Sequence, residues 1–153
     1  MADALLTIEN LTKTFGDKML FENISFGINA GQKTAIIARN GYGKSTLLNI
    51  ITGSVLQDEG RVTFSNDTRI AYLPQNPHFG DHLTIRSYIE SAEKPEDEDD
   101  WNYDHRVEET LSRLGIVNLD QTIDTLSGGE QKKLALSHIL LDNTNLLLLD
   151  EPT

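Results

Sequence analysis

The chain has 153 residues, of which 38% are hydrophobic and 24% charged, a composition typical of one globular domain with a buried core. No apolar run approaches the ~18 residues of a membrane-spanning helix, and the absence of cysteine excludes disulfides and thiol chemistry. The formal net charge of −11 repels nucleic acid phosphates. Because the start of the chain also lacks the basic region of a secretory signal, we expect a cytoplasmic protein with no membrane span.

The first part of the chain is typical of short strands separated by turns. Strands are expected at residues 5–8, 11–15 and 24–28. The more continuous apolar run at residues 33–37 predicts a strand buried on both faces. A glycine-rich turn follows, and residues 45–52 predict a helix that ends at Gly53.

The next two strands are expected at 61–64 and 69–73, after which the chain is predicted to be helical. The acidic run Glu93–Asp100 is expected to be a solvated loop and not a metal site. Apolar spacing then predicts a helix that ends at Gly115 and a second helix near Gly129, the latter with three inward side chains, Leu136, Ile139 and Leu140.

Four consecutive leucines, Leu146–Leu149, are typical of a central parallel strand and lead directly into two acidic residues. The succession of strand, glycine-rich turn, helix, inserted helices and strand predicts an α/β fold with an inserted helical part.

The glycine-rich turn has the setting of a phosphate-binding loop, because it follows an expected strand and opens an expected helix. Gly41 and Gly43 let backbone N–H groups turn toward phosphates, and the helix start adds partial positive charge. Lys44 would reach the β- and γ-phosphates, and the Ser45 hydroxyl suits Mg²⁺. The alternative is a flexible glycine turn before an ordinary helix. The nucleotide contacts are predicted to be Ala38, Arg39, Asn40, Gly41, Tyr42, Gly43, Lys44, Ser45 and Thr46.

Ala38 stands where the usual phosphate-loop pattern has its first glycine. A methyl group there is costly only if the backbone needs a positive φ. We expect the loop to tolerate Ala38, because residues 40–45 build the cradle itself.

The acidic pair after the leucine run suits the metal and water of a nucleotide hydrolase. Asp150 can hold magnesium through water, and Glu151 can orient or deprotonate the attacking water. Alone, the segment would be better explained as a buried strand with solvated carboxylates. The phosphate loop earlier in the chain favours the functional interpretation.

Two further segments add groups of the same kind. Ser127, Gly128 and Gly129 open a helix whose start is receptive to anions, although Ser127 alone would be no more than an N-cap. Gln75 follows a strand and could contact both metal and water, although a lone glutamine in a turn is usually a surface residue.

In this order, the phosphate loop, Gln75, Leu126–Glu130 (LSGGE) and Leu146–Thr153 (LLLLDEPT) resemble an ABC ATPase over the whole chain. Within that superfamily the chain is most similar to the soluble ABC-F group and its Uup-like members, on three segments, Glu22–Phe26, Tyr72–Pro77 and Trp101–Tyr103. The resemblance implies a P-loop NTPase fold with an N-terminal antiparallel β subdomain and an inserted helical subdomain.

The resemblance also implies roles for single residues. Phe15 would stack on adenine, Gln75 would be the Q-loop residue that contacts the metal, and Glu151 would be the catalytic carboxylate. Ser127, Gly128 and Gly129 would form the signature loop, which contacts the γ-phosphate of ATP held by a second cassette. The implied ligands are ATP and Mg²⁺, and the implied partner is a cassette of the same parent chain or of a second copy.

The resemblance implies one partial cassette over 1–153, divided into a β subdomain with the phosphate-loop core (1–75), a Q-loop and helical subdomain (76–141) and a final strand (142–153). Family members continue with a switch histidine on a strand that lies between those of the phosphate loop and of Asp150. We therefore expect an incomplete core sheet, and no ATP turnover by the isolated chain.

Three functions remain open at this point. The first is an ABC-F-type ATPase whose parent works on ribosomes or nucleic acid, although the interval from Gln75 to Ser127 is too short for a long arm. The second is the nucleotide-binding subunit of a membrane transporter. The third is a remnant that binds nucleotide without hydrolysis. A second cassette after residue 153 would favour the first, and a membrane domain would favour the second.

Overall fold

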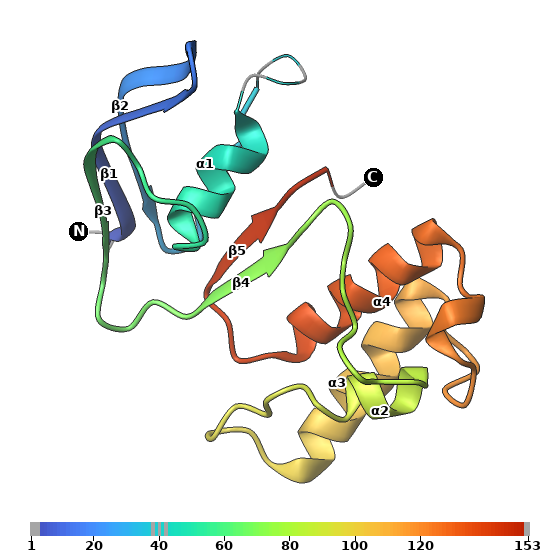
Figure 1. Ribbon diagram of the computed structural model, residues 1–153. Coiled ribbons are helices and arrows are strands. Elements are labelled where there is room, and N and C mark those ends of the chain that lie inside the picture. Colours follow the sequence, from blue (N-terminus) through green and yellow to red (C-terminus); the bar gives the residue numbers. More distant parts are fainter. Residues whose placement is uncertain (1–3, 38, 40, 42, 152–153) are drawn as a thin grey trace. The chain divides into compact units, whose positions relative to one another are not determined.

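The computed structural model describes residues 4–37, 39, 41 and 43–151, which form two compact units, 1–70 and 71–153. The first unit has a three-stranded sheet, and a two-stranded sheet belongs with the second (Figure 1). The fold is α/β, with an antiparallel β part and a helical part, as the sequence predicts.

The first sheet is built around a long hairpin. β1 (Ala4–Phe15) and β2 (Lys18–Asn29) run antiparallel, and β3 (Glu59–Phe64) pairs with the other edge of β1. Each hairpin strand is longer than the sequence predicts, because irregular residues sit inside the strands and do not end them. Asn10 in β1 and Asn23 in β2 have φ of 50° and 52°, and the register between β1 and β2 shifts after Ile8.

Gly60 makes the close pairing of β3 with β1 possible. Its φ is +89°, and a Cβ there would lie 2.4 Å from the backbone oxygen of Asn10. Any other residue would have to push the two strands apart. On β1, the side chains of Leu6, Ile8 and Leu11 are almost fully buried and contribute to the core of this unit.

The predicted helix after the glycine-rich turn is confirmed as α1 (Lys44–Ile51), which is followed by Gly53 at φ +78°. The predicted strand at 33–37 is wrong. These residues form no strand, and the side chain of Ile37 is 94% exposed. An apolar run becomes a buried strand only when neighbouring strands pair with it, and no strand of the described residues does so.

The second sheet pairs β4 (Ile70–Leu73) with β5 (Leu146–Leu149), and Figure 1 shows both arrows pointing the same way. The backbone N–H of Asp150 extends this pairing by donating to the oxygen of Leu73 at 2.9 Å. The two strands expected at 61–64 and 69–73 are confirmed as β3 and β4, but they do not pair with each other, since β3 joins β1 and β4 joins β5. Leu146 and Leu148 are buried, whereas Leu147 and Leu149 are partly exposed on the other face.

The rest of the second unit is helical. Its helices are α2 (Ile85–Ile89), α3 (Asp100–Leu114), a 3₁₀ turn (Ile123–Thr125) and α4 (Gly128–Leu141). Side chains from all four form one core, Ile85, Ile89, Leu111, Ile123, Leu134 and Leu141. A second cluster joins α4 to β4 through Ala71, Leu73, Ala135 and Ile139.

The helix ends follow the sequence prediction, but one inward side chain does not. Gly115 ends α3 at φ +73°, and α4 begins one residue before Gly129. Leu140 was expected to point inward and is 47% exposed. The helix α2 was not predicted, because five residues are too few for a periodic pattern.

The acidic run is exposed, as expected, but it is also tied to the helices. The Arg106 guanidinium donates to the Glu98 carboxylate at 2.6 Å and to the backbone oxygen of Leu140 at 2.9 Å. A cation at the last carbonyls of a helix is favourable, so Arg106 caps α4 and anchors the loop at once.

Candidate functional site

The predicted phosphate loop opens α1 through two glycines in the left-handed region. Gly41 has φ +79°, and Gly43, the N-cap of α1, has φ +87°. A Cβ on Gly43 would lie 3.1 Å from the Cβ of Leu20 and 3.3 Å from the ring of Phe21, so glycine is needed for both conformation and space. Three other predicted residues of this loop, Ala38, Asn40 and Tyr42, lie outside the described residues.

The start of α1 has the electrostatic character of an anion site. Among the described residues no side chain caps it, and its first turn contains no acidic residue. Lys44 is its first residue, followed by exposed Ser45 and partly buried Thr46. The backbone N–H groups of a helix start, the helix dipole and a lysine charge therefore coincide, and this combination suits a polyphosphate.

The hairpin tip connects the predicted adenine contact to this loop. Phe15, at the end of β1, is 57% exposed and pairs with Lys18 across the two-residue turn. The Lys18 ammonium donates to the backbone oxygen of Gly41 at 3.0 Å. The structure thus places the exposed aromatic ring on the strand pair that contacts the phosphate loop. Sequence reasoning missed Lys18, although the tight turn at Gly16 would have placed it opposite Phe15.

In the second unit, Asp150 is a buried carboxylate at the end of β5. Asp150 is 5% exposed, and the Tyr72 hydroxyl donates to its Oδ2 atom at 3.5 Å. Burial, and then the charge of Asp150, raise the pKa of Tyr72, so the hydroxyl stays protonated at neutral pH. A carboxylate has about four acceptor positions, and the Tyr72 hydroxyl uses one of them; carboxylate oxygens of this kind suit a hard cation such as Mg²⁺.

Two residues singled out separately from the sequence meet here. The Gln75 amide donates from Nε2 to Glu151 Oε2 at 3.1 Å. Glu151 has φ +49°, a conformation uncommon for residues other than glycine. The Lys132 ammonium, from α4, donates to the backbone oxygen of Glu151 at 3.0 Å. Sequence reasoning missed Lys132, because nothing in the local pattern links a helix residue to a turn so far along the chain.

The predicted signature loop forms the N-terminus of α4 and is closed by a reciprocal cap. The Ser127 hydroxyl accepts from the Glu130 backbone N–H, and the Glu130 carboxylate accepts from the Ser127 N–H at 2.8 Å and hydroxyl at 2.6 Å. These bonds lower the pKa of Glu130. Gly128 and Gly129 are exposed, and a Cβ on either would meet no atom within 4 Å.

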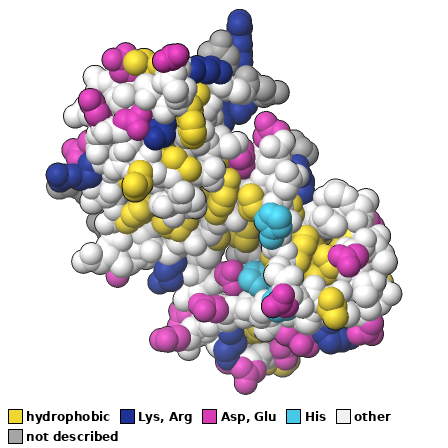
Figure 2. Space-filling model, in the orientation of Figure 1, with side chains coloured by type: hydrophobic (Ala, Val, Ile, Leu, Met, Phe, Trp, Pro, Cys, Tyr) yellow, Lys and Arg dark blue, Asp and Glu magenta, His cyan; other side chains and the backbone are white. Residues whose placement is uncertain are grey.

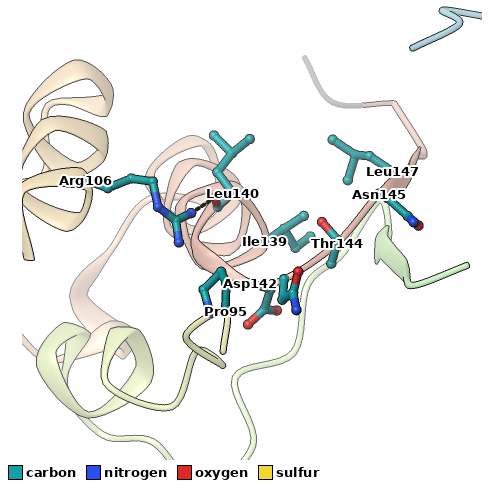
Figure 3. A pocket seen from close by; sticks show the side chains of 9 residues that line it. Pro95, Arg106, Ile139, Leu140, Asp142, Thr144, Asn145 and Leu147 are labelled. Carbon is teal, nitrogen blue, oxygen red and sulfur yellow. Dashed lines mark hydrogen bonds between the residues drawn. The ribbon is translucent and has the colours of Figure 1, made fainter. Parts of the chain in front are cut away.

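A cavity of about 400 Å³ lies elsewhere in the second unit and contains none of the predicted site residues. Figure 3 shows it between Arg106, Leu140 and Leu147, beneath the C-terminal end of α4. Figure 2 shows acidic side chains scattered over the helical part of the chain. None of the described helices is both long and apolar enough to cross a membrane.

The family model described as "ABC transporter" matches residues 21–153. ATP-binding protein Uup of Buchnera aphidicola (subsp. Acyrthosiphon pisum) is 31% identical over 98% of this chain and 26% of that protein. Zinc import ATP-binding protein ZnuC of Buchnera aphidicola (subsp. Baizongia pistaciae) is 33% identical over 97% of this chain and 60% of that protein. The chain therefore spans less than two thirds of both relatives.

Among solved structures, a nucleotide-free ATP-binding cassette from an ABC transporter is similar to this chain, with a TM-score of 0.72 and 28% identity. The match covers 99% of this chain and 70% of the other. Both units of the chain therefore have counterparts in a solved cassette.

Proposed function

This chain belongs to the ABC transporter family, as an ATP-binding domain with the P-loop NTPase fold of the ABC cassette, and on that premise we propose how its residues serve ATP. The phosphates would lie on the start of α1, held by Lys44 and by backbone N–H groups from Arg39 to Thr46. The exposed ring of Phe15 would stack on the adenine.

The start of α1 carries this proposal. It combines two left-handed glycines, an N-terminus that no described side chain caps, and a lysine as first residue. Each feature alone occurs in ordinary helices. Together they place N–H donors and a positive charge at a first turn that contains no acidic residue, which favours binding of a phosphate chain.

The groups proposed to bind magnesium are the Ser45 hydroxyl in the first unit and, in the second unit, the acceptor oxygens of Asp150 and Gln75. Burial of Asp150, whose Oδ2 accepts from the Tyr72 hydroxyl at 3.5 Å, supports its place in that set. When bound, the ion would neutralise charge on the phosphates. Glu151 would accept a proton from the attacking water, and the Gln75 amide would keep the carboxylate oriented through the 3.1 Å bond.

The whole protein is proposed to be an ABC-F-type ATPase in the cytoplasm, with Ser127, Gly128 and Gly129 contacting ATP on a second cassette. Similarity to Uup over nearly the full chain supports this. A transporter subunit is the second candidate, supported by comparable similarity to ZnuC. The sequence after residue 153 distinguishes them, since a second cassette would indicate the first and a membrane partner the second.

The test is titration of MgATP into the full-length protein that carries this cassette. Lys44→Ala should weaken binding by ~1.5–3 kcal/mol, because a charge-assisted contact is lost. Lys133→Ala, an exposed lysine of α4, is the matched control and should bind normally. Glu151→Gln should retain ATP binding and slow hydrolysis by ~10²–10⁴-fold. Unchanged binding by Lys44→Ala would overturn the assignment of the phosphate loop.

A further inference from the structure

Lys132 joins the helix that begins at the signature loop to the residue proposed as catalytic base. It lies in the second turn of α4, five residues after Ser127. Its ammonium donates to the Glu151 backbone oxygen at 3.0 Å, and the side chain is partly buried. The contact spans 19 positions of sequence, so no local turn accounts for it.

Glu151 needs such support. Its φ of +49° costs free energy in a residue with a Cβ, and such conformations persist where neighbouring groups fix them. Three contacts act on this turn: the Asp150 N–H on Leu73, the Gln75 amide on the Glu151 carboxylate, and the Lys132 ammonium on the Glu151 carbonyl. The first fixes the chain before Glu151, and the second engages the end of its side chain. Lys132 is the contact that holds the Glu151 peptide itself.

We propose that Lys132 is a positioning residue, which holds the Glu151 backbone in its left-handed conformation and thereby aims the carboxylate at water. The proposal rests on the proposed role of Glu151 as base. A shift of about 1 Å in a reacting group can cost on the order of 100-fold in rate, so an anchor on its backbone affects the chemical step. An ammonium suits the task because it makes a charge-assisted bond to a carbonyl without neutralising the carboxylate directly.

The experiment compares four forms of the full-length protein in steady-state ATP hydrolysis: wild type, Lys132→Met, Lys132→Arg and Lys133→Met. Lys132→Met removes the donor but keeps the length of the side chain, and should lower kcat about 10-fold or more with KM for ATP unchanged. Lys132→Arg keeps a donor and should recover most of kcat. Lys133→Met changes the neighbouring exposed lysine and should behave as wild type.

A second measurement separates positioning from a general structural role. In a Glu151→Gln background, Lys132→Met should produce no further loss of rate, because its effect acts through the missing carboxylate. If the Lys132 contact merely stabilised the fold, Lys132→Met would raise KM and lower the melting temperature. Its loss of rate would then add to that of Glu151→Gln. This comparison stays informative if Lys132→Met alone is poorly stable, since Lys132→Arg tests the same contact.

The measurements distinguish an error in the role proposed for Glu151 from an error in the role proposed for Lys132. If Glu151→Gln hydrolyses ATP at the wild-type rate, the proposed base is wrong and the role of Lys132 falls with it. If Glu151→Gln is slow but Lys132→Met has a normal kcat, or loses rate additively in the double variant, the role of Lys132 is overturned and that of Glu151 stands. A Lys132→Arg variant as slow as Lys132→Met would also contradict the proposal.

Discussion

Two helices of this chain begin at glycine-containing motifs, and their first turns are built in opposite ways. The start of α1 at Gly43 has no cap from a described side chain and no acidic residue. The start of α4 at Ser127 is closed by the Glu130 carboxylate, which takes both the Ser127 N–H and its hydroxyl. No described side chain caps the start of α1, whereas the start of α4 already holds the Glu130 carboxylate.

This difference shows that a serine or glycine motif before a helix is not sufficient to identify a phosphate site. The decisive feature is whether the first-turn N–H groups have partners within the chain. By that criterion the start of α1, which no described side chain caps, is the one we propose as the phosphate site. At α4 the Ser127 N–H and hydroxyl already bond to Glu130, so the proposed contact with ATP of a second cassette would depend on the exposed Gly128 and Gly129 or on release of this cap.

The largest expected effect is on the free energy of unfolding when a glycine at each helix start is replaced by alanine. Gly43→Ala should lower the free energy of unfolding by about 1–3 kcal/mol, because φ is +87° and the new methyl would press on Leu20. Gly128→Ala meets open space and should change it by no more than about 1 kcal/mol. Urea denaturation of both variants measures this. Equal losses would contradict the comparison.

An intermediate effect is expected when an acidic residue is placed in the first turn of α1, as in α4. Thr46 is the third residue of α1, the position that Glu130 holds in α4. Thr46→Glu should stabilise α1 by about 0.3–1 kcal/mol through the helix dipole, and weaken MgATP binding about 10-fold or more by charge repulsion. Calorimetric titration measures the affinity, with Thr46→Gln as the uncharged control. Unchanged affinity would mean that phosphates do not lie on this turn.

The smallest expected effect is the pH dependence of the α4 cap. The Ser127 hydroxyl and N–H lower the pKa of Glu130 below its ordinary value of 4.5. A carboxyl whose pKa is lower in the folded state stabilises the protein fully above the unfolded value, and this contribution is lost as pH falls through the folded value. Thermal melts from about pH 6 to about pH 3 should therefore show a steeper decline in wild type than in Glu130→Gln. If the melting temperatures of both forms fell equally with pH, the Glu130 cap would not stabilise the fold.

Local patterns were enough to predict what local interactions determine. The helix α1 after the glycine turn, the end of α3 at Gly115 and the start of α4 all follow from caps, breakers and periodicity. The roles of Glu151 and Gln75 are also predicted from their residue types and stay predictions, while the structure joins the two side chains by a 3.1 Å hydrogen bond.

What the sequence did not predict depends on distant partners. The pairing of β3 with β1 and of β4 with β5 joins segments far apart in the chain, as do the contacts of Lys18 and Lys132. The exposure of Leu140 has another cause. Buried residues lie on several sides of α4, since one side packs on β4 and another on α2 and α3. When a helix is apolar on nearly all sides, the spacing of its apolar residues does not show which of them are exposed.

The pairing of β1 with both β2 and β3 also sets an order of assembly. A two-residue turn joins β1 to β2, whereas the pairing of Leu6 with Phe64 must close a segment that includes the phosphate loop and α1. Closing the longer segment costs more chain entropy, so the hairpin is favoured to form first and the β1–β3 ladder later. The loop at Gly41 and Gly43 would then acquire its final form late on the folding route. A nucleotide bound there would stabilise interactions that form late, and we therefore expect it to slow unfolding more than it speeds folding.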